Sequence, residues 1–138
     1  MLDTTTPKGS RAAQRLAEEM VAWLTTVRPD GRPQTSPVWF LYRDGEFLVF
    51  SKAGTARTVN IAANPRVSLN LDGNGLGGDI VVVEGEARID RDVLPADRVP
   101  DYVEKYAGFI ARNGWTPESF AADYPIPIRI RPTRFRVW

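Results

Sequence analysis

The sequence predicts a mainly β fold with inserted helices, in which about six antiparallel strands form a barrel or a strongly curved sheet. Two observations support this prediction. Most of the strand-like segments are joined by short turns typical of hairpins, and the helical segments do not alternate regularly with strands as a parallel sheet requires. A length of 138 residues with 43% hydrophobic composition fits one domain spanning residues 1–138.

The first third of the chain is predicted to hold one helix followed by three strands. Residues 1–10 are polar and are expected to be flexible, after which Ser10 can cap a helix over about Arg11–Met20. Pro37 lies inside the second strand, and because proline cannot donate to a ladder it marks that strand as an edge or a bulge. The three strands, separated by tight turns, are expected at Val21–Val27, Gln34–Tyr42 and Phe47–Ser51.

The middle of the chain is predicted to hold a short helix and two strands. Thr55 can cap the helix, and Asn64-Pro65 ends it because the residue before proline avoids helical angles. The run Ile80–Val83 is apolar without alternation, which indicates a central strand covered on both faces. The helix and the strands are expected at Ala56–Ala63, Arg66–Leu71 and Ile80–Ile89.

The last third is predicted to hold two helices and the final strand. Pro100 opens a helix with apolar residues at helical spacing, and Gly114 ends it. Thr116-Pro117 opens a shorter helix that ends near Tyr124-Pro125. The C-terminal residues then alternate apolar side chains with arginines, as in a half-buried strand, with an interruption at Pro132.

The composition excludes several kinds of catalysis. The chain has no cysteine and no histidine, which rules out Ser-His-Asp and Cys-His nucleophilic chemistry, zinc-cysteine sites and iron-sulfur clusters. No metal site is expected, since the commonest metal ligand is absent. Catalysis by such a chain would have to use carboxylates, Lys or Arg, tyrosines, hydroxyls or an organic cofactor, and the last option is attractive.

Charge and hydropathy limit the partners and the location. The net charge is +1, and the C-terminal arginines alternate with apolar residues, so solvated or interface charges are favoured over a nucleic-acid surface. No apolar run approaches the roughly 18 residues of a membrane span, and the first residues, Met1–Pro7, lack the basic and apolar segments of a secretory signal. We therefore expect a soluble, cytoplasmic protein without nucleic-acid partners.

Two motif-like patterns have simpler interpretations. Gly73, Gly75 and Gly78 match the letters of a dinucleotide-binding fingerprint, but a valine-rich strand follows them where the fingerprint needs a helix. Glu84 and Glu86 point to one side of a strand, a pairing suited to acid-base work. Two glutamates on a sheet surface are usually solvated, and we assign them no catalytic role.

The segment Ser51–Ile61 has the components of an anion site. Lys52 and Arg57 flank a helix start, where free backbone N–H groups and the helix dipole attract negative charge. Gly54 permits close backbone approach, and neighbouring threonines add hydroxyl donors. The same residues also fit an ordinary capped helix with two exposed bases, and the segment alone leaves both interpretations open.

A second segment, Gln34–Phe40, can offer hydrogen bonds to the edge of a flat heterocycle. It combines hydroxyls and an amide with Pro37, which frees neighbouring backbone groups from the ladder. Trp39 or Phe40 can supply an aromatic wall, although aromatic residues in strands more often lie in the core. Alternation decides which of the two faces inward, and the register across the proline is left open.

Together these segments resemble the pyridoxamine 5'-phosphate oxidase-like split β-barrel superfamily, which also contains FMN-binding split barrels. The resemblance spans roughly residues 11–138 and is carried by Gly31–Pro33, Ser36–Phe40, Ser51-Lys52, Arg57–Ile61 and Asn64–Val67. More narrowly, the chain resembles the B-type branch of flavin/deazaflavin oxidoreductases, whose members use the deazaflavin coenzyme F-420.

The resemblance implies which residues bind the cofactor. Lys52, Arg57, Thr58 and Asn60 would hold the phosphate and tail of the coenzyme, while Gln34, Ser36, Pro37 and Val38 would line the deazaflavin ring. Trp39 and Ser51 complete the set of candidate cofactor-binding residues.

The resemblance also implies a homodimer with coenzyme sites between the two barrels, where Trp138 and the last arginines reach the partner's site. Thr55 stands where related sequences can carry another base, which leaves F-420, FMN or weak binding open.

The implied activity is hydride transfer from reduced F-420 to an electron-poor small molecule such as an enone or a quinone. Water or one of Tyr42, Tyr102 and Tyr106 would supply the proton, and no side chain is assigned as catalytic. Two alternatives remain: an FMN-dependent oxidoreductase of the same fold, and a carrier protein that binds F-420 or a flavin without turnover.

Overall fold

The computed structural model describes all 138 residues and has seven strands and four α-helices. The helices are α1 (Pro7–Glu18), α2 (Ala56–Ala63), α3 (Pro100–Arg112) and α4 (Pro117–Asp123), with a short 3-10 helix η1 at Ala96–Arg98. The strands are β1 (Ala22–Val27), β2 (Pro33–Val38), β3 (Leu41–Arg43), β4 (Glu46–Ser51), β5 (Arg66–Asn70), β6 (Val81–Ile89) and β7 (Ile126–Val137). The predicted mainly β fold with inserted helices is confirmed.

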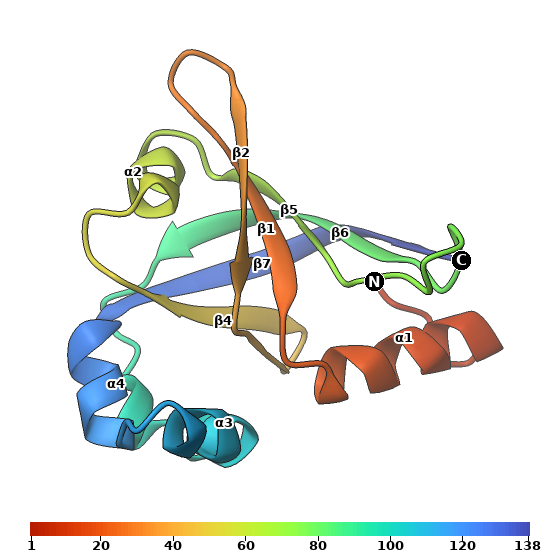
Figure 1. Ribbon diagram of the computed structural model, residues 1–138. Helices are drawn as coiled ribbons and strands as arrows, with labels where there is room; N and C mark the ends of the chain where they lie inside the picture. The colour runs from red at the N-terminus through yellow and green to blue at the C-terminus, as the bar shows by residue number, and fades with distance from the viewer.

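The strands form one antiparallel sheet in the order β2-β1-β5-β6-β7-β4-β3. Consecutive strands β2 and β3 lie at its two opposite edges, and the sheet curls strongly into a half-barrel (Figure 1). The predicted single strand Gln34–Tyr42 is therefore wrong, and the sheet has seven strands instead of six. The strand breaks because Trp39 and Phe40 leave one edge of the sheet and carry the chain to the other.

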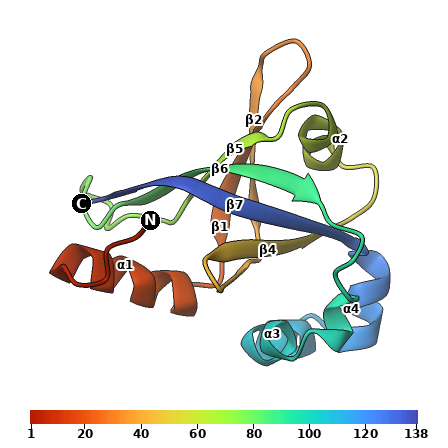
Figure 2. The ribbon, with the colours of Figure 1, turned by 180° about the vertical axis from the view of Figure 1, so that it is seen from behind.

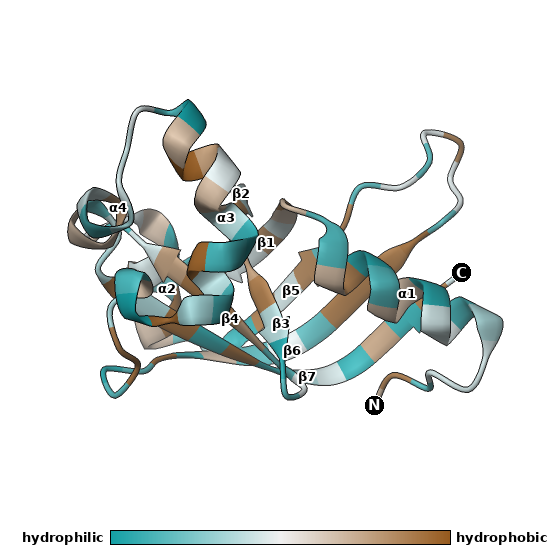
Figure 3. Ribbon diagram, turned by 90° about the horizontal axis from the view of Figure 1, so that it is seen from below, coloured by the Kyte–Doolittle hydropathy of each residue, from teal (hydrophilic) through white to brown (hydrophobic).

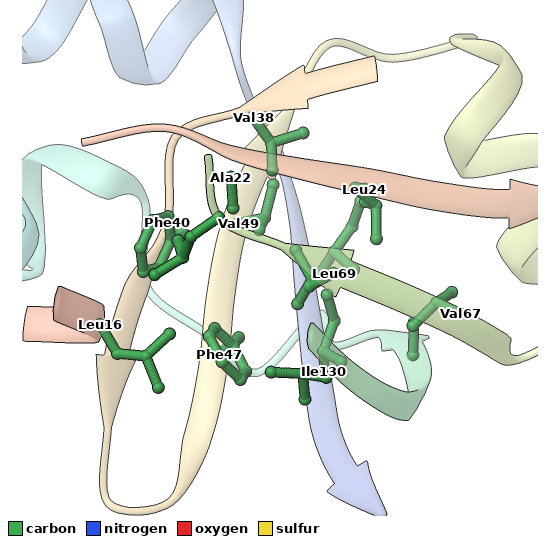
Figure 4. Close-up of a cluster of buried hydrophobic side chains, with 14 of the residues drawn as sticks. Leu16, Ala22, Leu24, Val38, Phe40, Phe47, Val49, Val67, Leu69 and Ile130 are labelled. Atoms are coloured by element: carbon green, nitrogen blue, oxygen red, sulfur yellow. The ribbon is translucent and has the colours of Figure 1, made fainter. Parts of the chain in front are cut away.

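The inside of the half-barrel holds the larger of two hydrophobic clusters, which contains Leu24, Phe40, Phe47 and Ile130 (Figure 4). α1 contributes to it through Leu16, while the sheet strands alternate apolar and polar residues (Figure 3). Burial of these side chains from the inner faces of several strands holds the curved sheet closed.

A second cluster lies on the outer face of β4, beneath α3 and α4. Leu48 and Phe50 point into it, while Phe47 and Val49 of the same strand point into the inner cluster. β4 is thus the strand covered on both faces. The prediction that the strand at 80–89 has this property is wrong, because burial alternates along β6, although β6 does lie at the centre of the sheet.

Several predicted boundaries are confirmed and three are corrected. Thr55 caps α2, as predicted, and Gly114 ends α3 with a φ of +74°. α1 begins at Pro7 and is capped by Thr6, so the predicted start at Arg11 with a Ser10 cap is wrong. β6 begins at Val81, one residue late. The expected break at Pro132 is a bulge within a continuous β7, because the register with β6 shifts there.

α3 and α4 lie together at one end of the half-barrel, and α2 lies apart from them, against β1 and β6 (Figures 1 and 2). The end of β4 and the start of β7 are paired, Ser51 with Ile126, so the segment that leads to α2 begins beside the end of α4. None of the helices combines the length and the apolar content that crossing a bilayer requires.

Candidate functional site

A cavity of about 350 Å³ opens between the edge of the sheet, α2 and the α3–α4 pair. Its lining residues are Pro37, Val38 and Trp39 from the β2 end, Phe50 from β4, Arg57 from α2, and Asn113, Trp115, Phe120 and Tyr124 from the α3–α4 region. The volume and the mostly apolar lining with few polar groups are typical of small-molecule and cofactor sites.

One wall of the cavity is a stack of aromatic rings. Trp39 lies parallel to Tyr106 at a centroid distance of 4.7 Å and to Phe120 at 5.3 Å, with interplanar angles of 4° and 12°. Phe120 continues the stack to Tyr124 at 4.6 Å. Rings held on several sides have little rotational freedom, so this wall of the cavity is rigid before any ligand binds.

The structure also resolves which aromatic residue of the Gln34–Phe40 segment faces the cavity. Trp39 does, whereas Phe40 is fully buried in the inner core. The Phe40 backbone is fixed from α3: its N–H donates to the Tyr106 hydroxyl at 2.7 Å, and Lys105 Nζ donates to its carbonyl at 2.7 Å. Burial lowers the pKa of Lys105 to about 8. α3 therefore replaces the missing strand partner and sets the position of Trp39.

Arg57 is the cation at the cavity wall. Its Nε and one terminal nitrogen donate to Ser36 Oγ at 3.3 and 3.1 Å, and the other terminal nitrogen donates to Ser51 Oγ at 3.0 Å. A guanidinium has five N–H donors, so two remain free. It forms no ion pair with an acidic side chain, and burial lowers its pKa. A half-buried cation that only hydroxyls hold is suited to an anionic ligand.

Lys52 lies at the same corner and is exposed. Its Nζ is 5.4 Å from the centre of the Tyr124 ring, and it too forms no ion pair. Ser51 beside it is buried, with its hydroxyl close to Thr55 Oγ1 at 3.2 Å. We refer to Ser36, Ser51, Lys52 and Arg57 as the basic corner.

The remaining predicted site residues behave differently. Thr58 is buried and its hydroxyl donates to the Thr55 carbonyl within α2. Asn60 is 3% exposed and its amide donates to Thr26 Oγ1 at 3.0 Å, toward β1 and away from the cavity. Gln34 carries a buried side-chain oxygen without a hydrogen-bond partner. Of the ten predicted residues, the cavity and the basic corner therefore unite seven: Ser36, Pro37, Val38, Trp39, Ser51, Lys52 and Arg57.

The residues from α3 and α4 and the strand residue Phe50 were missed by the sequence analysis. Asn113, Trp115, Phe120 and Tyr124 lie more than 50 positions after Arg57, and no local motif joins them to it. The available signal was the density of aromatic residues over 102–124, which is equally typical of a core.

The two rejected motifs have structural roles. β6 follows the glycine-rich segment directly, with no helix to hold a pyrophosphate. Glu84 and Glu86 form ion pairs with Arg136 and Arg131 on the sheet surface.

Comparisons with known proteins agree with this architecture. No curated protein matches the chain in sequence. Among solved structures, a conserved hypothetical protein from Mycobacterium tuberculosis shares 26% identity over 94% of this chain and 82% of its own, with a TM-score of 0.74. An F420 reductase shares 25% identity over 89% and 94%, with a TM-score of 0.66. A heme storage protein from Vibrio cholerae is similar in fold, at 18% identity over 96% and 95%, with a TM-score of 0.67.

The sequence itself matches a known family over nearly its whole length. The pattern of the pyridoxamine 5'-phosphate oxidase family fits residues 10–138, which include every strand and the entire cavity lining. With the curled antiparallel sheet and the structural relatives, this match confirms the predicted split β-barrel: the chain belongs to the pyridoxamine 5'-phosphate oxidase family.

Proposed function

We propose that the protein is an oxidoreductase that uses coenzyme F-420 to reduce an electron-poor small molecule such as an enone or a quinone. The observation that carries the proposal is Arg57, a half-buried cation without an acidic partner at the wall of an aromatic-lined cavity. F-420 joins a flat ring to a phosphate-bearing tail, and the aromatic wall and the basic corner match these two parts.

The residues present fit such a coenzyme. The cavity lining supplies apolar and aromatic surface for the ring, and Arg57 supplies a cation for the phosphate. Ser36 Oγ accepts two bonds from Arg57, so its own hydrogen is free to donate to a phosphate oxygen.

In this proposal the chain binds and orients, and the coenzyme performs the redox step. A bound reduced deazaflavin supplies a hydride to an electron-poor carbon. Trp39 and Phe120, which line the cavity, would exclude water from the site in which the coenzyme and its substrate are held. Arg57 neutralises the phosphate, while the hydroxyls of Ser36 and Ser51 keep its guanidinium in place.

The similarity to an F420 reductase favours F-420 over FMN, which remains the alternative cofactor on the same fold. The similarity to a heme storage protein is confined to the fold. This chain lacks histidine and cysteine, two common axial ligands of heme iron, which argues against heme as its ligand.

We further propose a homodimer with the cofactor sites between the two copies. The cavity is bounded on one side by the edge strand β2, which a second copy would cover. Trp138, at the end of the chain, is 54% exposed, and a second copy would bury its ring. A mass measurement in solution that gives one copy would contradict this arrangement.

Two linked measurements test the proposed function. The purified protein is titrated with F-420 and with FMN, and reduced F-420 is then offered with a panel of enones and quinones. Binding of F-420 with turnover is expected. Binding of FMN alone would favour the flavin alternative, tight F-420 binding without turnover would favour a carrier, and binding of neither would refute the proposal.

A further inference from the structure

Tyr124 lies where the two ends of the site meet. It follows α4 directly and precedes β7, whose first residue, Ile126, pairs with Ser51 at the end of β4. The strand pairing therefore brings the tyrosine beside Lys52, which follows Ser51 in the chain. Lys52 Nζ lies 5.4 Å from the centre of the Tyr124 ring.

None of the other three tyrosines of the chain lines the cavity, although the buried Tyr102 hydroxyl also has no hydrogen-bond partner. Tyr102 and Tyr106 are fully buried, and the Tyr106 hydroxyl already bonds the backbone of Met20 and Phe40. Tyr42 packs on Phe47, at the inner core. Tyr124 alone lines the cavity, which separates it from the three tyrosines that the sequence offered as proton donors.

The Tyr124 hydroxyl has no partner within the protein, while its ring is held firmly. The ring stacks on Phe120 at 4.6 Å with an interplanar angle of 13°. Its proximity to Arg57 partly offsets the lowering of the Arg57 pKa by burial. The Tyr124 ring thus lies beside Lys52 and lines the same cavity as Arg57, and neither cation has an acidic partner.

We propose that Tyr124 is a third ligand for the phosphate of the bound coenzyme, donating its O–H to a phosphate oxygen together with Arg57 and Lys52. This inference rests on the proposed function. A hydroxyl donor to an ionised acceptor forms a strong, charge-assisted hydrogen bond, and the ring face also restrains the Lys52 ammonium. Because no protein group accepts from this half-buried hydroxyl, it is free to donate to a ligand phosphate in place of water.

The test compares ligands with and without the phosphate. The cofactor-free protein is titrated with FMN and with riboflavin, and in parallel with F-420 and with its phosphate-free deazariboflavin core. Tyr124→Phe keeps the ring stack and removes only the hydroxyl. We expect it to weaken binding of the phosphorylated ligand by roughly 3- to 10-fold and to leave the phosphate-free ligand unchanged.

Two variants separate the inference from the proposed function. Tyr42→Phe, with its ring in the inner core, is the matched control and is expected to change neither affinity. Arg57→Ala is the positive comparison, since it removes a phosphate ligand of the basic corner. Suppose that Arg57→Ala weakens binding of the phosphorylated ligand. If Tyr124→Phe then leaves that binding unchanged, or weakens binding of the phosphorylated and phosphate-free ligands equally, the role of Tyr124 is refuted and the proposed function stands. If the wild-type protein binds none of the four ligands, both are refuted.

Discussion

The basic side chains of β7 and those of the basic corner have opposite surroundings. Three of the four arginines of β7 are paired with a carboxylate, and the fourth, Arg134, is exposed without one. The pairs join Arg129 to Asp90, Arg131 to Glu86 and Arg136 to Glu84, at N–O distances of 3.0, 3.3 and 2.9 Å. At the basic corner, neither Arg57 nor Lys52 has a carboxylate partner. Arg57 lines the cavity, and Lys52 lies over the ring of Tyr124, which lines it too.

This difference shows that the number of basic residues is a poor guide to ligand binding. Three of the four β7 arginines are neutralised by the protein itself, and the fourth, Arg134, is exposed to solvent, so an added anion gains little on this strand. Arg57 is partly desolvated and held only by neutral hydroxyls, so its charge is left for a ligand. The predictions below test this contrast, from the largest expected effect to the smallest.

Arg57→Ala is expected to have the largest effect on ligand binding. Loss of a charged hydrogen-bond donor at the cavity should weaken the binding of F-420 or FMN by about 1–3 kcal/mol. Titration by fluorescence or calorimetry measures this change, with thermal unfolding as a check on folding. An unchanged dissociation constant would show that the basic corner does not bind the cofactor.

Lys105 is intermediate between the paired β7 arginines and the unpaired Arg57. It has no carboxylate partner, but its ammonium group donates to the Phe40 carbonyl and lies over the Phe40 ring. Burial lowers its pKa to about 8 in the folded chain, below about 10.4 when unfolded. Between these two pKa values the unfolded chain binds a proton that the folded chain does not. The free energy of unfolding should therefore rise with pH from about 8 upward. Because the group is partly exposed, the rise should be on the order of 1 kcal/mol.

Denaturant unfolding at pH 7.5 to 9.5 measures this slope, in a range below the ionisation of the buried tyrosines. Burial raises the pKa of both Tyr102 and Tyr106, so they stay neutral there in the folded chain. Lys105→Met keeps most of the side-chain stem and should remove the rise. If the free energy of unfolding of this variant still rises over the same pH range, the rise comes from another group.

Lys52→Ala is expected to weaken cofactor binding less than Arg57→Ala does, by roughly 3-fold. Lys52 is exposed, and solvent and salt screen its charge. The loss should shrink further as the ionic strength is raised, whereas the Arg57→Ala loss should depend less on salt. Equal losses for the two variants at high salt would contradict this order.

Arg131→Ala should have the smallest effect and serves as the matched control on β7. Its pair with Glu86 is exposed on the sheet surface, so the free energy of unfolding should fall by less than about 0.5 kcal/mol. Cofactor affinity should not change. A clear loss of affinity would show that charge on β7 contributes to ligand binding.

Local sequence patterns predicted much of the fold. Capping residues, prolines and turn glycines placed α2, α3 and α4 within a few residues of their observed limits, because such signals act over one or two helical turns. The start of α1 was misplaced since Thr6 and Ser10 are both good caps, and Pro7 next to Thr6 decides between them. The break after Val38 was missed because its cause, Tyr106 and Lys105, lies in a distant helix.

The candidate site likewise has one part that local sequence patterns predicted and one part that they did not. The basic corner follows from a contiguous segment, in which the helix start and its flanking cations are visible in the sequence. The aromatic wall does not, since Trp39 meets Phe120 only through the packing of α4 on η1 and α3. Asn60 was assigned a ligand contact from the family resemblance, but in the structure its side chain donates to Thr26 on β1.

The sequence by itself determined the kind of chemistry open to this protein and the local elements. Without cysteine or histidine it points to a borrowed cofactor, and its caps and turns fix where the helices and hairpins begin and end. Only the tertiary structure decided which cations are free and which aromatic rings face them. Pairing and burial depend on residues far apart in the chain, and the curled sheet brings those residues together.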